Sequence, residues 1–273
     1  MKSPSRSHLL PLSDRFSRLP YWLLAAIVLA VLLLWGITND QDYRLIFNAV
    51  RKGLGTTIYV SVAAYSAAVI LGLLLSLLRV HRNRVLQEVT TLYTEIMRGV
   101  PMLVLLYYIS FVGAPALVAA LNALGAPLIE REWVGKLDIR QVDFTARAVL
   151  ALTLGYSAFI GEIFRAGIQS IEKDQTEAGQ VEGATYAQIM RFIILPQAVR
   201  NVLPALGNEF IAILKDSALV SALGVQDITQ LGKLYSASTF KFFETYNVVA
   251  FLYLTMTMGL AALIRFVEQR LGR

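Results

Sequence analysis

The chain has 273 residues, 56% of them hydrophobic and 16% charged, and a formal net charge of +6. This composition is more apolar than that of soluble domains and predicts a membrane protein. The positive charge implies no nucleic-acid partner, because membrane proteins concentrate Lys and Arg on their cytoplasmic side.

The sequence does not indicate metal, cofactor or nucleotide chemistry in this chain. There is no cysteine, and the two histidines, His8 and His81, lie in basic polar stretches where histidine is normally solvated. The chain also lacks the GxxxxGK[ST] pattern of a P-loop. We therefore expect no catalytic residue, no metal and no cofactor. Any ATP that drives transport would be hydrolysed on a partner chain.

The first apolar stretch, residues 19–39, follows a basic tail at residues 1–18. It is longer than the ~7–15 apolar residues of a signal peptide. The polar sequence after it, TNDQDY, contains no small-x-small cleavage site. We therefore expect an uncleaved membrane-spanning helix.

Five further stretches are predicted to span the membrane, for which about 20 apolar residues suffice. Three of them are free of charge: residues 53–78, 99–129 and 245–264. Another, residues 148–161, is short but continues into Glu162 and Arg165, which can pair on one helix face near the headgroups. The stretch 201–225 completes about six spans in an all-α, polytopic membrane protein.

The stretch 99–129 is longer than one span requires. Towards its end it contains Gly113, Pro115, Gly125 and Pro127, which disturb helices. We expect its tail, from about Ala116, to be a short interfacial or re-entrant piece that leads into a polar loop.

An even number of spans places both termini on the same side of the membrane. Fifteen of the 25 basic residues fall on that side, and the other side balances its basic residues with acids. By the positive-inside rule both termini, including the tail 266–273, are cytoplasmic. Residues 39–52 and 130–147 are then exposed on the outside.

A polar segment between two spans, EAGQVEGATYAQIMRFIILPQA at residues 177–198, falls on the cytoplasmic side in this topology. Residues 173–182 favour a helix, Gly183 interrupts it, and residues 185–195 favour a second helix that Pro196 ends. The apolar face of such an element needs a partner surface. Its periodicity alone also fits an amphipathic helix lying on lipid.

This segment resembles the EAA loop of permease subunits of binding-protein-dependent ATP-binding-cassette (ABC) importers. The matching residues are Glu177, Ala178, Gly183, Ile193, Leu195 and Pro196. Where the family usually has Ala this chain has Gly179, which we expect to loosen the first helix slightly while leaving its contact face intact. The resemblance implies that residues 173–198 dock into the ATPase. The coupling residues that it implies are Glu177, Ala178, Gly179, Gly183, Leu195 and Pro196.

The resemblance extends over residues 53–265 and narrows the family to polar amino-acid permeases of the histidine, glutamine and glutamate type. Three segments carry this likeness: YTEIMRGVPMLVLLYY (93–108), GEIFRAGIQSIEKDQTEAG (161–179) and LPALGNEFIAILKDSALVS (203–221). It implies a type I (MetI-like) permease core of five helices, to which residues 19–39 add an N-terminal helix.

The same resemblance implies a permease subunit, not an enzyme, of an ATP-driven importer of polar amino acids in the bacterial inner membrane. Its partners would be a cytoplasmic ABC ATPase dimer, a second identical or related permease subunit, an extracytoplasmic amino-acid-binding protein and membrane lipid. An opine or a sulfur-containing amino acid stays open as cargo. A stand-alone secondary transporter or channel is a further alternative, against which the EAA-like spacing argues.

Charged residues inside the stretch 201–225 are candidates for substrate binding, because a charge within a membrane is costly. Glu209, Lys215 and Asp216 have no charged neighbour three or four residues away, so we expect their partners on other helices. A free amino acid carries an ammonium and a carboxylate, which Asp216, Lys215 and Ser217 could hold. Alternatively, these charges only hold the helix bundle together.

Arg98 and Pro101 belong to the Arg-Gly-x-Pro sequence at the start of one span. They are candidates for gating residues. Arg98 could also be an anchor whose long side chain reaches the headgroups at the cytoplasmic edge.

Overall fold

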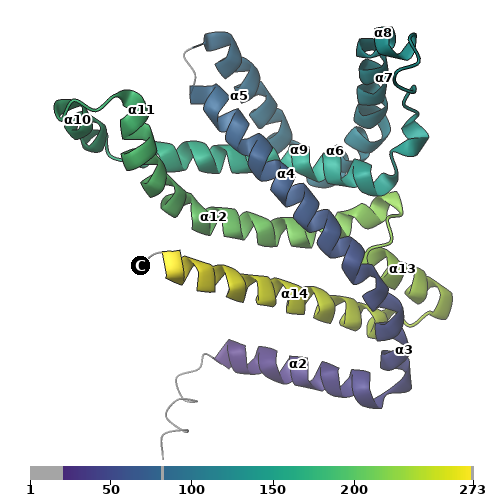
Figure 1. The fold of residues 1–273 in the computed structure, drawn as a ribbon. Coiled ribbons are helices and arrows are strands. Elements are labelled where there is room, and N and C mark those ends of the chain that lie inside the picture. Colours follow the sequence, from purple (N-terminus) through teal and green to yellow (C-terminus); the bar gives the residue numbers. More distant parts are fainter. Residues whose placement is uncertain (1–20, 81–82, 272–273) are drawn as a thin grey trace, which may run out of the picture.

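The computed structural model describes residues 21–80 and 83–271 of the chain (Figure 1). This part of the chain is predominantly helical and contains no strand, which confirms the all-α prediction for it. The predicted tail 1–18, both histidines and the last two residues lie outside the described residues.

The helices follow one another with short connections. The first half of the described chain forms α2 (Tyr21–Asn39), α3 (Gln41–Val50), α4 (Leu54–Val80), α5 (Arg84–Gly99), α6 (Met102–Tyr108), α7 (Ala114–Leu124) and α8 (Ala126–Ile129). The second half forms α9 (Phe144–Gln169), α10 (Lys173–Val181), α11 (Tyr186–Ile189), α12 (Leu195–Asp216), α13 (Ile228–Thr239) and α14 (Phe242–Leu271). The 3-10 turns are η1 (Arg51–Gly53), η3 (Ile139–Gln141) and η5 (Ser217–Leu223), and the π turns are η2 (Ile109–Gly113) and η4 (Met190–Ile194).

Five segments of the described chain are long and apolar enough to cross a membrane: Gln41–Arg79, Met102–Leu124, Phe144–Gln169, Ala187–Leu223 and Phe242–Arg270. The apolar helix α2 precedes them with 19 residues and packs on α3 and α14. The structure therefore confirms the predicted polytopic, all-α membrane protein, with five candidate spans and the apolar helix α2 before them.

One predicted loop turns out to be helical. Residues 39–52 contain α3, whose first turn is capped by the Asp40 carboxylate, 2.8 Å from the backbone nitrogen of Asp42. The apolar face of α3 buries Ile46 against α13 and α14. Asp42 also forms an ion pair with Lys241, just before α14. The sequence hid this helix because it is only ten residues long and its apolar residues are interrupted by polar ones.

The centre of the bundle is α9, which packs against α4, α5, α6 and α12 (Figure 1). A Cβ atom at Gly72 would lie 2.9 Å from the backbone nitrogen of Gly161, so α4 and α9 touch where only glycine fits. A Cβ atom at Gly167 would lie 2.1 Å from Val202, so α12 approaches α9 in the same way. Small residues at crossings are expected in a membrane, where close packing drives helix association.

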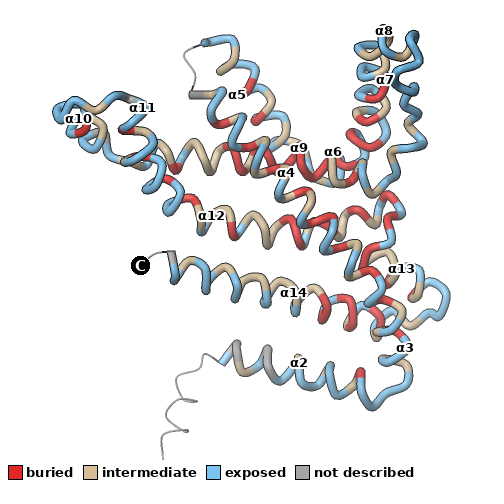
Figure 2. The backbone as a smooth tube through the Cα atoms, in the orientation of Figure 1, coloured by how far each residue is buried: buried red, intermediate tan, exposed pale blue. Residues whose placement is uncertain are grey.

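Buried residues gather where α4, α6, α9 and the end of α12 meet, and a second cluster lies between α3, α13 and α14 (Figure 2). The long outer helices α2, α4 and α14 expose large apolar side chains along much of their length. In a soluble protein such surfaces would be aggregation sites, whereas here they suit contact with lipid. The α10–α11 hairpin and the α7–α8 segment stand out from the bundle and are largely exposed.

The predicted short piece from about Ala116 is helical and continuous with the span before it. The chain stays helical from Met102 to Leu124, with the π turn η2 in the middle. α6 and η2 pack against α9, whereas the main neighbours of α7 are η2, α8 and η3. Accordingly, α7 runs across the direction of α9 and α12 in Figure 1. The chain therefore turns away from the bundle while it remains helical.

The two π turns explain how Pro115 and Pro196 are accommodated near the start of α7 and α12, whereas Pro204 lies inside α12 without such a turn. Each has five residues, and a proline follows as the second residue after it: Pro115 after η2 and Pro196 after η4. A proline ring in an α-helix clashes with the carbonyl four residues earlier, and the wider π turn relieves that clash. The prediction that Pro196 ends a helix is therefore wrong, because the chain continues directly into α12.

Candidate functional site: a helical hairpin and a polar stripe

The segment 173–198 forms a hairpin at one end of the bundle, between α9 and α12 (Figure 1). The C-terminal end of α14 lies at the same end of the molecule. The helix, bend, helix pattern predicted from the sequence is confirmed, with α10 as the first helix and α11 with η4 as the second.

At the bend, α10 ends in a tight turn and α11 begins shortly after it. Gly183 has a φ of +82°, and the N–H groups of Gly183 and Ala184 donate to the carbonyls of Gln180 and Gly179, both at 3.0 Å. This is the Schellman arrangement, which favours glycine at the left-handed position. Thr185 and Gln188 then form a reciprocal capping box at the start of α11.

Gly179 has a different role from the one expected. A Cβ atom at this position would lie 2.8 Å from Cγ1 of Ile189 and 3.3 Å from Cδ1 of Ile193. Ile189 is fully buried, so it has little room to move. Gly179 does not merely loosen α10; it allows the two arms of the hairpin to pack together. Gly179 was expected to loosen helix α10, and the structure shows that it also allows α10 to pack against Ile189 and Ile193.

The outer face of the hairpin is exposed. Glu177 and Ala178 are exposed on α10, Val181 is 89% exposed, and Phe192 on η4 is 68% exposed. A cavity of about 380 Å³ lies beside the bend, lined by Glu182, Gly183, Ala184, Gln188, Ile189, Phe192 and Ile193. Apolar side chains exposed beside a hollow and a nearby carboxylate form a surface suited to a partner protein.

Both ends of the hairpin are fixed to each other. The side chain of Asn201 donates to the hydroxyl of Ser170 at 3.0 Å, which joins the start of α12 to the end of α9. The contact of Gly167 with Val202 lies directly beside this hydrogen bond in sequence. A displacement of the hairpin must therefore move α9 and α12 together.

An ion cluster joins α9 to α4 near the same end. Glu162 pairs with Arg165 on its own helix, as predicted, and with Arg79 at the end of α4 at 2.7 Å. Arg165 also donates to the side chain of Gln169. The sequence could not reveal Arg79 as a partner, because the two residues are 83 positions apart.

The stripe of charges on α12 finds its partner on α9. The hydroxyl of Tyr156 donates to Oδ2 of Asp216 at 2.8 Å, and Glu209 is close enough to both groups to interact electrostatically. The expectation that the partner lies off the helix is confirmed for Asp216. Tyr156 was not among the predicted site residues, because its only signal in the sequence is a polar hydroxyl within an apolar span.

The other two candidate substrate residues differ in exposure. Lys215 is exposed, whereas Ser217 is fully buried and its hydroxyl donates to the carbonyl of Leu214 at 2.7 Å. Asp216 lies between them, where α12 gives way to the 3-10 turn η5. Such a change of helical type within a span often marks a hinge.

The two candidate gating residues lie on either side of the point where helix α5 ends and helix α6 has not yet begun. α5 ends at Gly99 and α6 begins after Pro101, whose carbonyl accepts from the N–H of Val104 at 2.9 Å. Arg98 is exposed, and its guanidinium carbon lies 5.6 Å from the centre of the Phe159 ring on α9. This cation–π contact holds Arg98 over the helix that carries Tyr156.

A buried carboxylate that the sequence analysis did not single out lies at the opposite end of the bundle. Asp227 caps α13 by accepting from the N–H of Gln230 at 2.8 Å, and it accepts from the hydroxyl of Tyr253 at 3.1 Å. Burial raises the pKa of Asp227 above its usual value, although these hydrogen bonds act in the opposite direction. The backbone of Asp227 packs so closely on Gly53 that no Cβ atom fits there. This cluster connects α13 and α14 to the start of α4.

A bundle of apolar helices, with charges inside one span and an exposed hairpin at one end, defines a polytopic membrane protein. The chain matches the family of binding-protein-dependent transport system inner membrane components over residues 68–273, and it belongs to that family. The hairpin and the polar stripe both lie within the matched part.

Individual relatives cover most of the chain. It is 35% identical to the probable amino-acid permease protein YxeN of Bacillus subtilis (strain 168), over 86% of this chain and 97% of the relative. It is 32% identical to the glutamine transport system permease protein GlnP of Escherichia coli (strain K12), over 84% of this chain and 97% of the relative.

Solved structures agree with the sequence relatives. A crystal structure of an amino acid ABC transporter with histidines is 33% identical, with a TM-score of 0.68, over 84% of this chain and 95% of that one. An inward-facing structure of the MetNI methionine ABC transporter is 20% identical, with a TM-score of 0.60, and shares the fold over 86% of this chain and all of that one. The MetI-like type I permease fold is thus confirmed.

Family membership settles the class of transporter. ABC importers of this kind hydrolyse ATP on a separate subunit and receive cargo from a binding protein, so such partners are implied for this chain. A stand-alone secondary transporter is not supported.

Proposed function

We propose that this chain is the permease subunit of an ATP-driven importer of polar amino acids, and that the α10–α11 hairpin is the element through which the ATPase drives it. The observation that carries this proposal is the exposed outer face of a hairpin whose inner face is closely packed. Val181 and Phe192 are largely exposed, while Ile189 is fully buried. The chain itself hydrolyses nothing, and it needs no cofactor.

The hairpin can transmit force because it is built into rigid elements. η4 leads without a break into α12, whose 22 residues end at Asp216. At 1.5 Å per residue this helix is about 33 Å long, enough to reach across the hydrocarbon core. A movement of the hairpin imposed by closure of an ATPase dimer would therefore shift Asp216 and open or close a path beside it.

Amino acids as cargo fit the polar stripe and the names of the relatives. Asp216 and Glu209 can hold an ammonium group, and the exposed Lys215 can hold a carboxylate. The hydrogen bond from Tyr156 keeps the Asp216 carboxylate in place while no substrate is bound. Ser217 is a weaker candidate than the sequence suggested, because its hydroxyl is used within its own helix.

The proposed assembly contains two permease subunits, identical or related, a dimer of ATPases and an extracytoplasmic binding protein in the bacterial inner membrane. Both termini and the hairpin lie in the cytoplasm. This orientation follows from the distribution of basic residues along the sequence. Arg98, at the break between α5 and α6, would act as a gate residue together with Pro101.

The proposed function is tested by purifying the tagged chain with the ATPase that binds it and measuring ATP-dependent amino-acid uptake in vesicles. Glu177→Lys should lower recovery of the ATPase, because it reverses a charge on the exposed face of α10. Glu130→Lys is the matched control, since it reverses an exposed charge just after α8, outside the hairpin. Equal ATPase recovery in both variants, or uptake that survives depletion of ATP, would contradict the proposal.

A further inference from the structure

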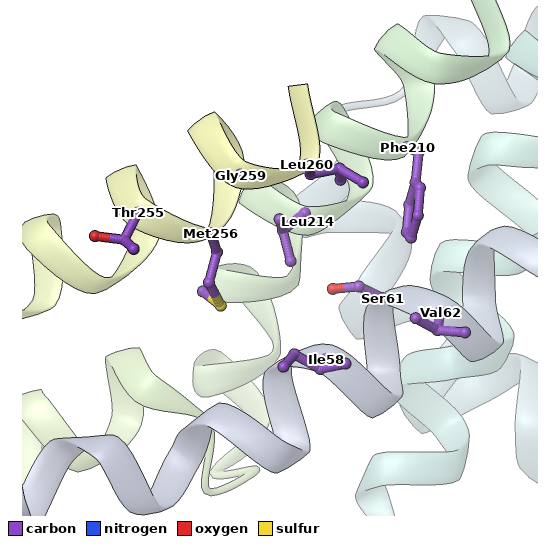
Figure 3. Close-up of a pocket in the computed structure, with 9 residues that line it drawn as sticks. All are labelled: Ile58, Ser61, Val62, Phe210, Leu214, Thr255, Met256, Gly259 and Leu260. Atoms are coloured by element: carbon purple, nitrogen blue, oxygen red, sulfur yellow. The ribbon is translucent and has the colours of Figure 1, made fainter. Parts of the chain in front are cut away.

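An apolar cavity of about 270 Å³ lies between α4, α12 and α14 (Figure 3). Its lining comprises Ile58, Ser61, Val62, Phe210, Leu214, Thr255, Met256, Gly259 and Leu260. The two hydroxyls in this lining are already bonded: Ser61 donates to the carbonyl of Thr57 at 2.7 Å, and Thr255 donates to that of Phe251 at 2.8 Å. A cavity without free polar partners is poorly suited to water and well suited to hydrocarbon.

A second apolar cavity, of about 220 Å³, continues the first between α12 and α14. The two cavities share Phe210 and Leu260. The second ends at Glu268, near the C-terminal end of α14. From Thr255 to Glu268 the combined groove follows α14 over thirteen residues, which is about 20 Å at 1.5 Å per residue.

The dimensions of the groove favour a single hydrocarbon chain as its occupant. One leaflet of the hydrocarbon core is about 15 Å thick, so a chain anchored at Glu268 can fill the groove towards the middle of the membrane. A helix of a second subunit, with a diameter of about 10 Å including side chains, is too wide to enter a space recessed between three helices of the same chain. The helix α2 does not cover the groove, because it lies on the other side of α14 from α12 (Figure 1).

The charged end of the groove indicates the headgroup. Glu268 lines the groove, and no described basic group lies within ion-pair distance of it. The Glu268 side chain is partly buried in the groove wall. A headgroup with an amine is complementary to this carboxylate. An anionic headgroup without an amine would meet Glu268 unfavourably.

We propose that the groove between α4, α12 and α14 binds one acyl chain of a phospholipid with an amine-bearing zwitterionic headgroup, held at Glu268. The site does not depend on the identity of the transported cargo. It places a lipid against α12, the helix that joins the hairpin to Asp216. Phe210, which lines both cavities, stacks on Tyr65 with 4.4 Å between ring centres and forms one wall of the groove.

The chain offers a matched pair of variants to test this site. A Cβ atom at Gly259 would meet nothing within 4 Å, so Gly259→Leu fills the first cavity without displacing its neighbours. Gly55 also has open space around its Cβ position and lies in a helix, but outside the groove. Gly55→Leu therefore reproduces the gain in helix propensity without filling the groove. Glu268→Gln changes the charged end and leaves the cavities intact.

The measurement is native mass spectrometry of the full chain, purified with its bound subunits and relipidated with phosphatidylethanolamine, phosphatidylcholine or phosphatidylglycerol of one acyl composition. The wild type and Gly55→Leu should retain about one phosphatidylethanolamine per chain, and Gly259→Leu about tenfold less. Glu268→Gln should lose the preference for phosphatidylethanolamine over phosphatidylglycerol.

Three results would overturn the proposal. One is a wild type that retains no lipid, and another is equal retention by the two leucine variants. The third is a Gly259→Leu protein that loses a permease subunit while each chain keeps its lipid, because the groove would then be a subunit contact. If Gly259→Leu fails to fold, Glu268→Gln decides, and an unchanged headgroup preference in that variant rejects the site.

Discussion

Replacing Gly183 tests whether the bend of the hairpin depends on backbone conformation alone. Its φ of +82° lies in the left-handed region, and a Cβ atom there would meet nothing within 4 Å. Gly183→Ala therefore adds no steric contact with the rest of the protein. It adds only the cost of a left-handed residue with a side chain, about 1–2 kcal/mol. Gly183→Asn should cost less, because asparagine tolerates this conformation.

The cost can be measured as local opening of the hairpin. The N–H groups of Glu182, Gly183 and Ala184 donate to carbonyls of α10, so their hydrogen exchange reports whether the bend is closed. A loss of 1–2 kcal/mol corresponds to roughly 5- to 30-fold faster exchange at these amides in Gly183→Ala. Exchange in Gly183→Asn should stay closer to that of the wild type.

The same pair of variants connects the bend to its partner. If the hairpin docks in its closed form, recovery of the ATPase should fall in the order wild type, Gly183→Asn, Gly183→Ala. Unchanged exchange in Gly183→Ala would refute the backbone argument. Equal acceleration in both variants would show that loss of glycine as such matters, rather than the left-handed conformation.

Three further predictions concern the path, the topology and the buried carboxylate. Asp216→Asn should weaken the affinity for the transported amino acid by about ten- to a hundred-fold, because a charge-assisted hydrogen bond of ~1.5–3 kcal/mol is lost. The ATPase should still co-purify with this variant. Unchanged uptake would exclude Asp216 from the transport path. In the cysteine-free chain, a single cysteine at Asp138 should react with an impermeant reagent in intact cells and one at Gln188 should not, and the reverse pattern would invert the topology. Burial raises the pKa of Asp227, so the native state binds the proton of this carboxyl more tightly than the unfolded chain does. The protonated carboxyl therefore stabilises the folded protein at low pH, and this stabilisation is lost as the pH rises through the raised pKa. Thermal unfolding measured as the pH rises from about 4, the ordinary range of an aspartate, should show that loss, and Asp227→Asn should flatten it. The same pH dependence in the variant would contradict this role.

Local sequence patterns predicted the features that depend on local interactions. The apolar spans follow from length and composition, and Gly183 marks the bend because a helix cannot continue easily through a left-handed glycine. The pair of Glu162 with Arg165 follows from helical spacing. The expectation that Asp216 has its partner on another helix followed from the lack of a charged neighbour on its own helix.

Features that depend on packing between distant segments could not be predicted from the sequence. Tyr156 and Arg79 become partners only when α9 lies against α12 and α4. Gly179 stands where the family usually has Ala, and the sequence alone did not show that the missing side chain leaves room for Ile189. Pro196 looked like the end of a helix, because the π turn that accommodates it has no sequence pattern that we recognised.

The contacts of α12 explain why a small movement of the hairpin can reach the transport path. At Gly167 and Val202 the helix is held against α9, and at Gly207 a Cβ atom would lie 2.5 Å from Ile264 of α14. Contacts as close as these leave little room for α12 to slide past its neighbours, because packed interfaces shift between discrete arrangements rather than deform continuously. The helix must therefore carry its neighbours with it or turn where its own geometry changes. That change occurs at Asp216, where α12 becomes the 3-10 turn η5, so the end of the rigid helix and the candidate substrate carboxylate coincide.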